Sequence, residues 1–434
     1  MARQGASIFL SNWAVLVVQL VTSVLVARTI GAELKGVLAL LTGTVALIAM
    51  LGQLGLPAAA IYFARSDTYN VRTFLASFSL VVVAVTVLAC LLVALLRVSF
   101  ITLFMAGAAL SDAEIWLTIA ALPAIMFYQF LASLLVGTGD AAAYRRLTIG
   151  FGLLNAGLTV LLVVVLRLGV VGTLWAALIS YTFVVGLSLN RLLGSIAGET
   201  VAPGLAPLGV MLRFGLQQYA GTVGSQLFKR ADIYLLALFL DTTAVGIYSV
   251  AQTAYEAVLS IPRAVNALIA GEVAGGKGAS SEQMVASTAR NVLWLMSAVT
   301  LGLICVSPLA VPLFYGPAFQ ASVLPMMILL CAAVLVGLTS TLQAYFLGVG
   351  RPDLNGLYPM VSGGVNLILS LLLIPVAGAA GNALATLLAA FCLLALTMRS
   401  FRHLSGLPIS VLWQIRQSDI TGWRTALRSA VRRL

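Results

Sequence analysis

The chain has 434 residues, of which 61% are hydrophobic and only 9% are charged, and its formal net charge is +11. A soluble domain carries about 25% charged residues, so this composition excludes a soluble globular protein and indicates a polytopic membrane protein. The basic excess therefore predicts no nucleic-acid partner; we expect it to report orientation in the membrane and anionic partners.

Apolar runs recur along the whole chain. Each has about 20 residues or more, the length of helix that crosses a bilayer. Inside hydrocarbon every backbone polar group must be bonded within its own segment, so we expect these runs to be helices. The sequence predicts twelve spans, near 7–29, 37–63, 74–96, 114–136, 146–166, 170–190, 212–240, 244–270, 288–314, 320–347, 355–375 and 380–398.

The distribution of Lys and Arg predicts the orientation of these spans. Eighteen of the 24 lie on the side of the N-terminus and four on the other side, at Arg28, Lys35, Arg97 and Arg167. Lys229 and Arg230 lie inside a span. Because cytoplasmic loops carry the excess of Lys and Arg, we expect both termini to be cytoplasmic.

The two halves of the chain repeat each other at an offset of about 210 residues. The stretch LLVGTGDAAAYRRLTIGFGLLN ends at Asn155, and YFLGVGRPDLNGLYPMVSGGVN ends at Asn366. Likewise, Gly36 in ARTIGAELKGVLAL corresponds to Gly246 in ALFLDTTAVGIYSV. Each half holds six spans, so we expect two similarly oriented lobes, 1–200 and 201–402, with the substrate path between the repeats.

Four stretches resemble the polysaccharide flippases of the multidrug/oligosaccharidyl-lipid/polysaccharide exporter superfamily, the Wzx-type O-antigen transporters. They are LVARTIGAELKGVLAL, FLDTTAVGIYSVAQTAYEAVLSIPRAV, PLFYGPAFQAS and AYFLGVGRPDLNGLYPMVSGGVNLILSLLLIPVAGAAGNALATLLA. The resemblance covers nearly the whole chain. It implies an all-α membrane protein whose two six-helix lobes surround a central cavity, in the inner membrane of a bacterium. It further implies alternating-access movement of a polyprenyl-diphosphate-linked saccharide from the cytoplasmic to the outer leaflet. The resemblance also implies that other membrane proteins of the same polysaccharide pathway, for example an exopolysaccharide pathway, are partners.

The seventh and eighth spans each have a polar face. Residues at helical spacing make up these faces: Gln218, Thr222, Ser225, Gln226 and Lys229 on one, and Tyr248, Gln252, Tyr255, Glu256, Ser260 and Arg263 on the other. An ionisable group near the bilayer centre costs about 3 kcal/mol or more and is rarely kept facing lipid. We therefore expect both faces to line a hydrated cavity, together with Gln19 from a weaker stripe on the first span.

The charges in these spans suggest how the substrate is bound. We expect its diphosphate to meet the cations and amides of Lys229, Arg230, Arg263, Arg28, Gln226 and Gln252. Glu256 is predicted to neutralise Lys229 or Arg230, or else to couple transport to an ion, and Asp232 to pair locally or hold Arg230. The alternative is that these charges pair only with each other to dock helices, and that Arg28 snorkels to lipid headgroups.

The chain offers little for catalysis or for a cofactor. Its only histidine, His403, lies beyond the last apolar run, and its four cysteines are isolated within apolar runs. We expect no metal, no cofactor, no catalytic residue and no enzyme activity. The alternatives are a cation-coupled multidrug antiporter, which needs carboxylates in the first lobe, and a membrane saccharide polymerase or glycosyltransferase. An enzyme of that kind needs a catalytic loop, whereas the predicted outside acids are scattered: Glu33, Asp112, Glu114 and Asp241.

The last part of the chain, 403–434, is basic. In DITGWRTALRSAVRRL the apolar residues share one helical face and the arginines take the rest. This pattern predicts an amphipathic helix on the anionic cytoplasmic leaflet, with a solvated tail as the alternative.

Overall fold

The computed structural model describes residues 2–63, 71–104, 110–195, 205–275, 279–349 and 351–414. Every regular element within these ranges is a helix, and none is a strand. The predicted all-α fold is confirmed, in keeping with the need of a chain in hydrocarbon to bond its own backbone. Contacts divide the chain into two compact units, which are 1–249 with 312–319, and 250–311 with 320–434.

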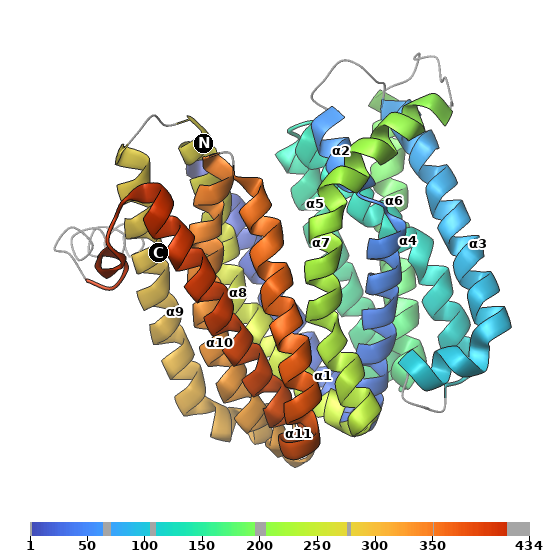
Figure 1. Cartoon of the computed structure of the whole chain (residues 1–434). Coiled ribbons are helices and arrows are strands. Elements are labelled where there is room, and N and C mark those ends of the chain that lie inside the picture. Colours follow the sequence, from blue (N-terminus) through green and yellow to red (C-terminus); the bar gives the residue numbers. More distant parts are fainter. Residues whose placement is uncertain are drawn as a thin grey trace. The chain divides into compact units, whose positions relative to one another are not determined.

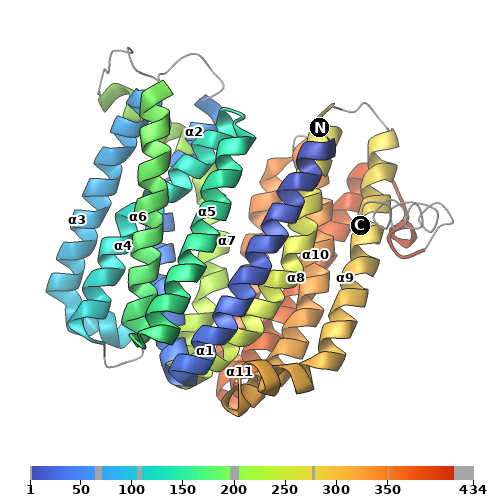
Figure 2. The same cartoon turned by 180° about the vertical axis from the view of Figure 1, so that it is seen from behind.

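Within the described ranges, the first unit holds seven helices, a π-helical segment and the first turns of an eighth helix. In chain order these are α1 (Ala2–Gly52), α2 (Leu56–Phe63), α3 (Val71–Phe104), α4 (Asp112–Gly137), α5 (Ala141–Thr159), η1 (Val160–Val165), α6 (Gly169–Ser195), α7 (Leu205–Phe239) and α8 (Thr242–Gly275). Helices α3 to α6 form one group in Figure 2, and α4 and α5 both pack on α6. Its core includes stacked Phe78 and Phe130, whose ring centroids are 3.9 Å apart.

Polar side chains cap several helices of this unit. Ser111 and Glu114 form a reciprocal capping box at the start of α4. Asp140 accepts a hydrogen bond from the Ala143 amide at the start of α5, and Asp241 accepts one from the Ala244 amide at the start of α8. Caps of this kind satisfy amides that have no partner inside the helix. Two of the acids predicted on the outside, Glu114 and Asp241, therefore have a local structural role.

The second unit contains the rest of α8, followed by α9 (Ala279–Phe314), η2 (Pro317–Ser322), α10 (Val323–Gly348), α11 (Pro352–Ser405) and η3 (Ile409–Leu412). The segment 312–319, which holds the end of α9 and the first half of η2, belongs to the first unit. Helices α10 and α11 lie side by side (Figure 1) and share a core in which Tyr345 and Phe401 meet edge to face.

Helices α1 and α11 each contain two predicted spans. α1 turns at Gly31, where the backbone leaves the helical region with φ 78°. Ser23 and Lys35, twelve residues apart, touch with Oγ and Nζ at 3.2 Å. In a straight helix those residues would be about 18 Å apart along the axis. The chain therefore reverses here, between the predicted spans 7–29 and 37–63.

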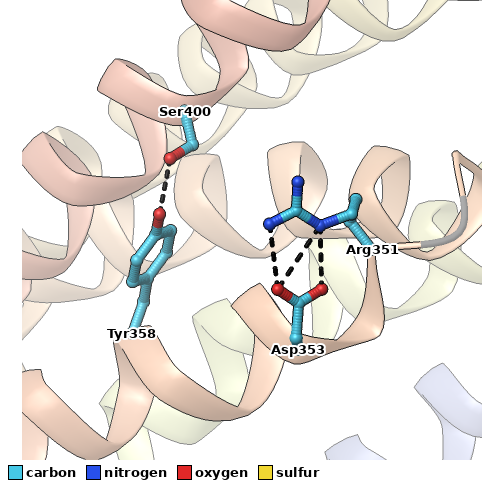
Figure 3. A network of polar contacts seen from close by, with 4 residues as sticks. All are labelled: Arg351, Asp353, Tyr358 and Ser400. Carbon is cyan, nitrogen blue, oxygen red and sulfur yellow. Dashed lines mark hydrogen bonds and ion pairs between the residues drawn. The ribbon is translucent and has the colours of Figure 1, made fainter.

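α11 turns in the same way at Gly378, with φ 57° and ψ −135°. Ser370 bonds Asn382, Ser362 bonds the Ala389 carbonyl, and the Tyr358 and Ser400 hydroxyls are 2.5 Å apart. The two partners of each contact lie on opposite sides of Gly378, and their separation in sequence grows from 12 to 27 to 42 residues. This pattern is expected of two antiparallel helices joined by a turn. Figure 3 shows the last of these contacts beside the Arg351–Asp353 ion pair at the start of α11.

The predicted spans correspond closely to these helices. Eight helical stretches among the described residues are long and apolar enough to cross a membrane, and two of them, Val15–Gly52 and Asp353–Ser405, contain the turns at Gly31 and Gly378. They account for ten of the twelve predicted spans. Helices α7 and α8, which carry the predicted polar faces, cover the other two without being among the eight.

One predicted span is wrong in detail. The run 37–63 is not continuous, because α1 ends at Gly52 and α2 begins at Leu56. Between them Leu54 and Gly55 have positive φ, 49° and 76°. A Cβ atom at Gly55 would lie 2.3 Å from the Gly215 carbonyl oxygen, so α7 comes too close for a side chain there. Apolar composition carries no signal for such a break.

Candidate functional site

The predicted polar face of α7 lies largely outside what the structure describes. The backbone of this face is helical, but the side chains of five of its residues are not among the described ones, namely Gln218, Thr222, Ser225, Gln226 and Lys229. Their predicted contact with substrate stays a prediction.

Arg230 is half-buried on α7, close to α1. A Cβ atom at Gly43 would lie 3.8 Å from a guanidinium nitrogen of Arg230. One residue further along α1, the Thr44 hydroxyl is 3.0 Å from the Tyr234 hydroxyl. Arg230 therefore lies at a polar contact between α1 and α7, where small residues let the two helices approach.

Asp232 is buried, with 6% of its surface exposed, and its partner comes from α8. The Tyr248 hydroxyl donates to one carboxylate oxygen of Asp232 at 3.4 Å, and the Ile233 amide donates to the other at 2.7 Å. Tyr248 is 1% exposed. The prediction that Tyr248 lines a cavity is wrong in this structure, because its ring is enclosed where α7 and α8 pack. The helical spacing places Tyr248 on the same face as Gln252. Near the start of α8, however, α7 packs closely enough to bury that face as well.

Glu256 forms an ion pair with Arg263, seven residues further along α8. Both side chains are about half exposed, with 60% for Arg263 and 49% for Glu256. The sequence predicts Lys229 or Arg230 as the partner of Glu256; the side chain of Lys229 lies outside the described ones, so that pairing stays a prediction beside the Arg263 contact. Two turns of helix separate the residues by about 10 Å, and two long side chains bridge that distance. Gln252 and Tyr255, on the preceding turn, are half-buried.

Arg28, at the end of the first span, has an exposed side chain that donates to the Leu313 carbonyl. Leu313 lies in the last turn of α9, where carbonyl groups have no partner within the helix. A cation is favourable at this end of a helix dipole. Arg28 therefore holds the 312–319 segment to α1. Gln19, two turns earlier on α1, is exposed.

Sequence reasoning missed a polar cluster next to Arg28. Lys35 donates to Ser23 at 3.2 Å, and the Ser23 side chain also hydrogen-bonds Tyr315. The Lys and Arg distribution places Lys35 only among the outside loop charges. The signal that could have found the cluster is the turn at Gly31, because it brings the ends of the first two spans together. The Ser23–Tyr315 contact adds a second link between α1 and the segment 312–319.

The described residues offer no metal site of ordinary composition. No three His, Cys, Asp or Glu side chains gather closely enough among them to hold a metal ion. The predicted basic tail, 403–434, is described only as far as residue 414, so its proposed helix lies outside the described residues. The described part ends in η3, where Leu412 is buried against the core of the second unit.

Comparison with solved structures gives the same fold for several membrane transporters. The chain is similar to a lipid II flippase, MurJ, in an inward closed conformation, with a TM-score of 0.77 and 16% identity over 94% of this chain and 89% of that one. It is also similar to an inward-facing multidrug resistance MATE family transporter of the MOP superfamily, with a TM-score of 0.64 and 19% identity over 90% and 95%. The MATE multidrug transporter DinF-BH has a TM-score of 0.66 and 18% identity over 94% and 96%. At such identities the likeness shows a shared fold.

The sequence itself matches one family. No curated protein matches the chain. The family described as polysaccharide biosynthesis protein matches residues 1–274, well over half of the chain, and the match runs from α1 to the end of α8. The chain belongs to the polysaccharide biosynthesis protein family.

Proposed function

We propose that the protein is a flippase that moves a polyprenyl-diphosphate-linked oligosaccharide or polysaccharide repeat unit from the cytoplasmic to the outer leaflet by alternating access. The observation that carries the proposal is the family match over 1–274 on a fold shared with a lipid II flippase. A protein of polysaccharide biosynthesis that consists of membrane helices is suited to transport a lipid-linked intermediate, as opposed to synthesising it.

The charges of the described helices support an anionic substrate. Arg28 and Arg263 are exposed cations within long helices of a chain with few charges. A cation held on such a helix faces water, a partner charge or a ligand, because facing lipid is costly. Arg263 has one carboxylate partner, Glu256. In our proposal the substrate diphosphate, which carries more negative charge than one carboxylate, competes with Glu256 for Arg263.

The orientation belongs to the same proposal. With both termini in the cytoplasm of a bacterial cell, Arg263 lies nearer the cytoplasmic face than Glu256 does. A diphosphate entering from the inner leaflet then meets Arg263 first. Arg28 and its contact with Leu313 lie at the opposite face, where the substrate leaves.

The proposal is tested in the producing cell. Deleting the gene should make the lipid-linked saccharide accumulate with its sugar in the cytoplasmic leaflet, where an impermeant glycosidase added outside spheroplasts cannot reach it. The same deletion should leave the total amount of lipid-linked sugar unchanged or raised. If the lipid-linked saccharide is no longer made at all, the protein acts in synthesis and the flippase proposal is wrong.

A cation-coupled efflux antiporter is the second candidate, because the fold is shared with MATE transporters. Such a protein needs a carboxylate that exchanges a cation, and Glu256 is a half-exposed acid on α8. Efflux of a cationic dye that stops in Glu256→Gln, from cells whose surface polysaccharide is normal without this gene, would favour the antiporter.

A further inference from the structure

A groove runs along α5 and α6 in the first unit, and its lining includes no residue of the candidate site. Its volume is about 470 Å³, within the usual range of about 300–1,000 Å³ for ligand sites. Its polar lining comes from Asp140, Arg146 and Ser188, and its apolar lining includes Leu154, Phe183 and Leu187. Leu154 is eight residues beyond Arg146, or about 12 Å along the helix. The groove is therefore charged at the start of α5 and apolar further into the helix.

A second hollow of about 480 Å³ adjoins the first, lined by Ala142, Arg145, Arg146, Ile149 and Gly150. Arg146 and Gly150 line both hollows. A Cβ atom at Gly150 would meet nothing within 4 Å. Gly150 therefore forms an open floor next to the two arginines.

Arg146 keeps its charge available at this groove. Its Nε donates to the Ala142 carbonyl at 3.3 Å, and its side chain is exposed. Asp140, the acid that lines the same groove, uses one carboxylate oxygen as the cap of α5. Among the described residues no carboxylate forms an ion pair with Arg146. The groove thus presents a guanidinium, the group best suited to hold a phosphate.

An exposed apolar stripe on α6 continues from the groove. Trp175, Ile179, Phe183 and Leu187 follow each other at intervals of four and lie on one side of the helix. Phe183 is 56% exposed and Leu187 57%. The stripe spans twelve residues, or about 18 Å, which is close to the length of an extended acyl chain. Hydrocarbon chains are the natural cover for such a face in a membrane.

We propose that this groove binds one anionic phospholipid of the surrounding membrane, with the phosphate at Arg146 and an acyl chain along Leu154, Phe183 and Leu187. The polar end of the groove lies at the membrane face that the Lys and Arg distribution assigns to the cytoplasm. Basic recesses between membrane helices on that face suit anionic headgroups. A zwitterionic lipid has the same chains but lacks the net negative charge. The site is independent of the proposed transport function.

Native mass spectrometry of the detergent-purified protein tests this inference. Phosphatidylglycerol should bind at one site at least fivefold more tightly than phosphatidylcholine. Arg146→Gln should abolish that preference. Gly150→Leu, whose Cβ would meet nothing within 4 Å, should fill the floor of the groove and remove the site while leaving the melting temperature unchanged or higher. The higher temperature is expected because leucine favours the helix.

Two variants serve as matched controls. Gly157→Leu places the same side chain two turns further along α5, where a Cβ atom also meets nothing within 4 Å. Arg351→Gln removes an exposed guanidinium that Asp353 already pairs. Both should bind phosphatidylglycerol as the unmodified protein does. Equal binding of the two lipids overturns the proposal. So does an equal loss of phosphatidylglycerol binding in Arg146→Gln and Arg351→Gln. Tight binding of a polyprenyl phosphate with no phosphatidylglycerol binding also overturns it and assigns the groove to the carrier lipid.

Discussion

Gly36 on α1 and Gly246 on α8 pack directly against each other, backbone to backbone. A Cβ atom on Gly36 would lie 1.7 Å from the Thr242 carbonyl oxygen, and one on Gly246 would lie 1.8 Å from the Ala32 carbonyl oxygen. The two contacts are equivalent under the repeat, since residue 32 corresponds to 242 and residue 36 to 246. A local two-fold axis therefore passes between these glycines. The positions that the sequence pairs as repeats are in contact in the folded chain.

The first prediction follows from this contact. Gly36→Ala or Gly246→Ala forces the two helices apart, and overpacking of this kind costs about 1–3 kcal/mol or more. We expect a lower melting temperature in detergent and less monodisperse protein after extraction. Gly157→Ala is the control, because its Cβ has open space and alanine favours the helix by about 1 kcal/mol. A melting temperature of Gly36→Ala equal to that of Gly157→Ala would contradict the contact.

The repeat was predictable because matching glycines and apolar runs of similar length recur in the sequence at a nearly constant offset. The turns at Gly31 and Gly378 fall in the gaps between predicted spans, and the twelve spans map onto helices. The break at Gly55 was not predictable, because it depends on the approach of Gly215 from a distant helix. The extent of the compact units was not predictable either, since the segment 312–319 joins the first unit through Arg28 and Ser23.

The second prediction concerns the turn that precedes the last span in each half of the repeat. Arg167 has φ 55° and stands 211 residues before Gly378, which has φ 57°. A non-glycine residue in this left-handed region costs roughly 1 kcal/mol. Arg167→Gly should therefore raise the melting temperature, whereas Gly378→Ala should lower it, because ψ −135° makes that position suitable for glycine alone. Shifts of the same sign in both variants would show that these turns are not equivalent.

The third prediction concerns Arg290 on α9, which is 2% exposed and donates to the Val411 carbonyl at 2.7 Å. Arg290→Met keeps much of the volume but leaves that carbonyl without its donor. The expected cost is about 1–3 kcal/mol of stability. Limited proteolysis should then cut at the segment 406–412 sooner than in the unmodified protein. Arg263→Met changes an exposed arginine and serves as the control, so the segment 406–412 should be cut at the same rate as in the unmodified protein. If proteolysis is accelerated equally in both variants, Arg290 has no special role in holding this segment.

The fourth prediction separates ligand binding from helix docking at Glu256 and Arg263. Arg263→Gln should reduce export of the saccharide about tenfold, the effect of losing roughly 1.4 kcal/mol of binding to an anion. Protein abundance should stay unchanged, because exposed ion pairs contribute only about 0–1 kcal/mol to stability. Glu256→Gln frees the guanidinium and should preserve export. Loss of export in both variants, restored by exchanging the two residues, would mean that the pair itself is what matters.

The candidate site shows where sequence reasoning fails. Helical spacing identified α8 as polar, and it placed Glu256 and Arg263 on one face. It could not choose among partners for Glu256, because two helices offered cations at similar depth. It also misjudged Tyr248, whose burial follows from packing against Asp232 and not from its own position in the pattern. Direct contacts between side chains depend on tertiary packing that no single helix encodes.

The central claim is that the protein moves a lipid-linked saccharide across a bilayer. The most direct measurement uses proteoliposomes that contain the purified protein and a fluorescent polyprenyl-diphosphate-linked oligosaccharide, quenched from outside by an impermeant reductant. We predict that the protein makes the inner-leaflet pool accessible, so that quenching exceeds the half reached in protein-free vesicles, and that Arg263→Gln slows this phase about tenfold. Quenching that stops at one half, with uptake of a cationic dye driven by a cation gradient in the same vesicles, would contradict the account and identify an antiporter.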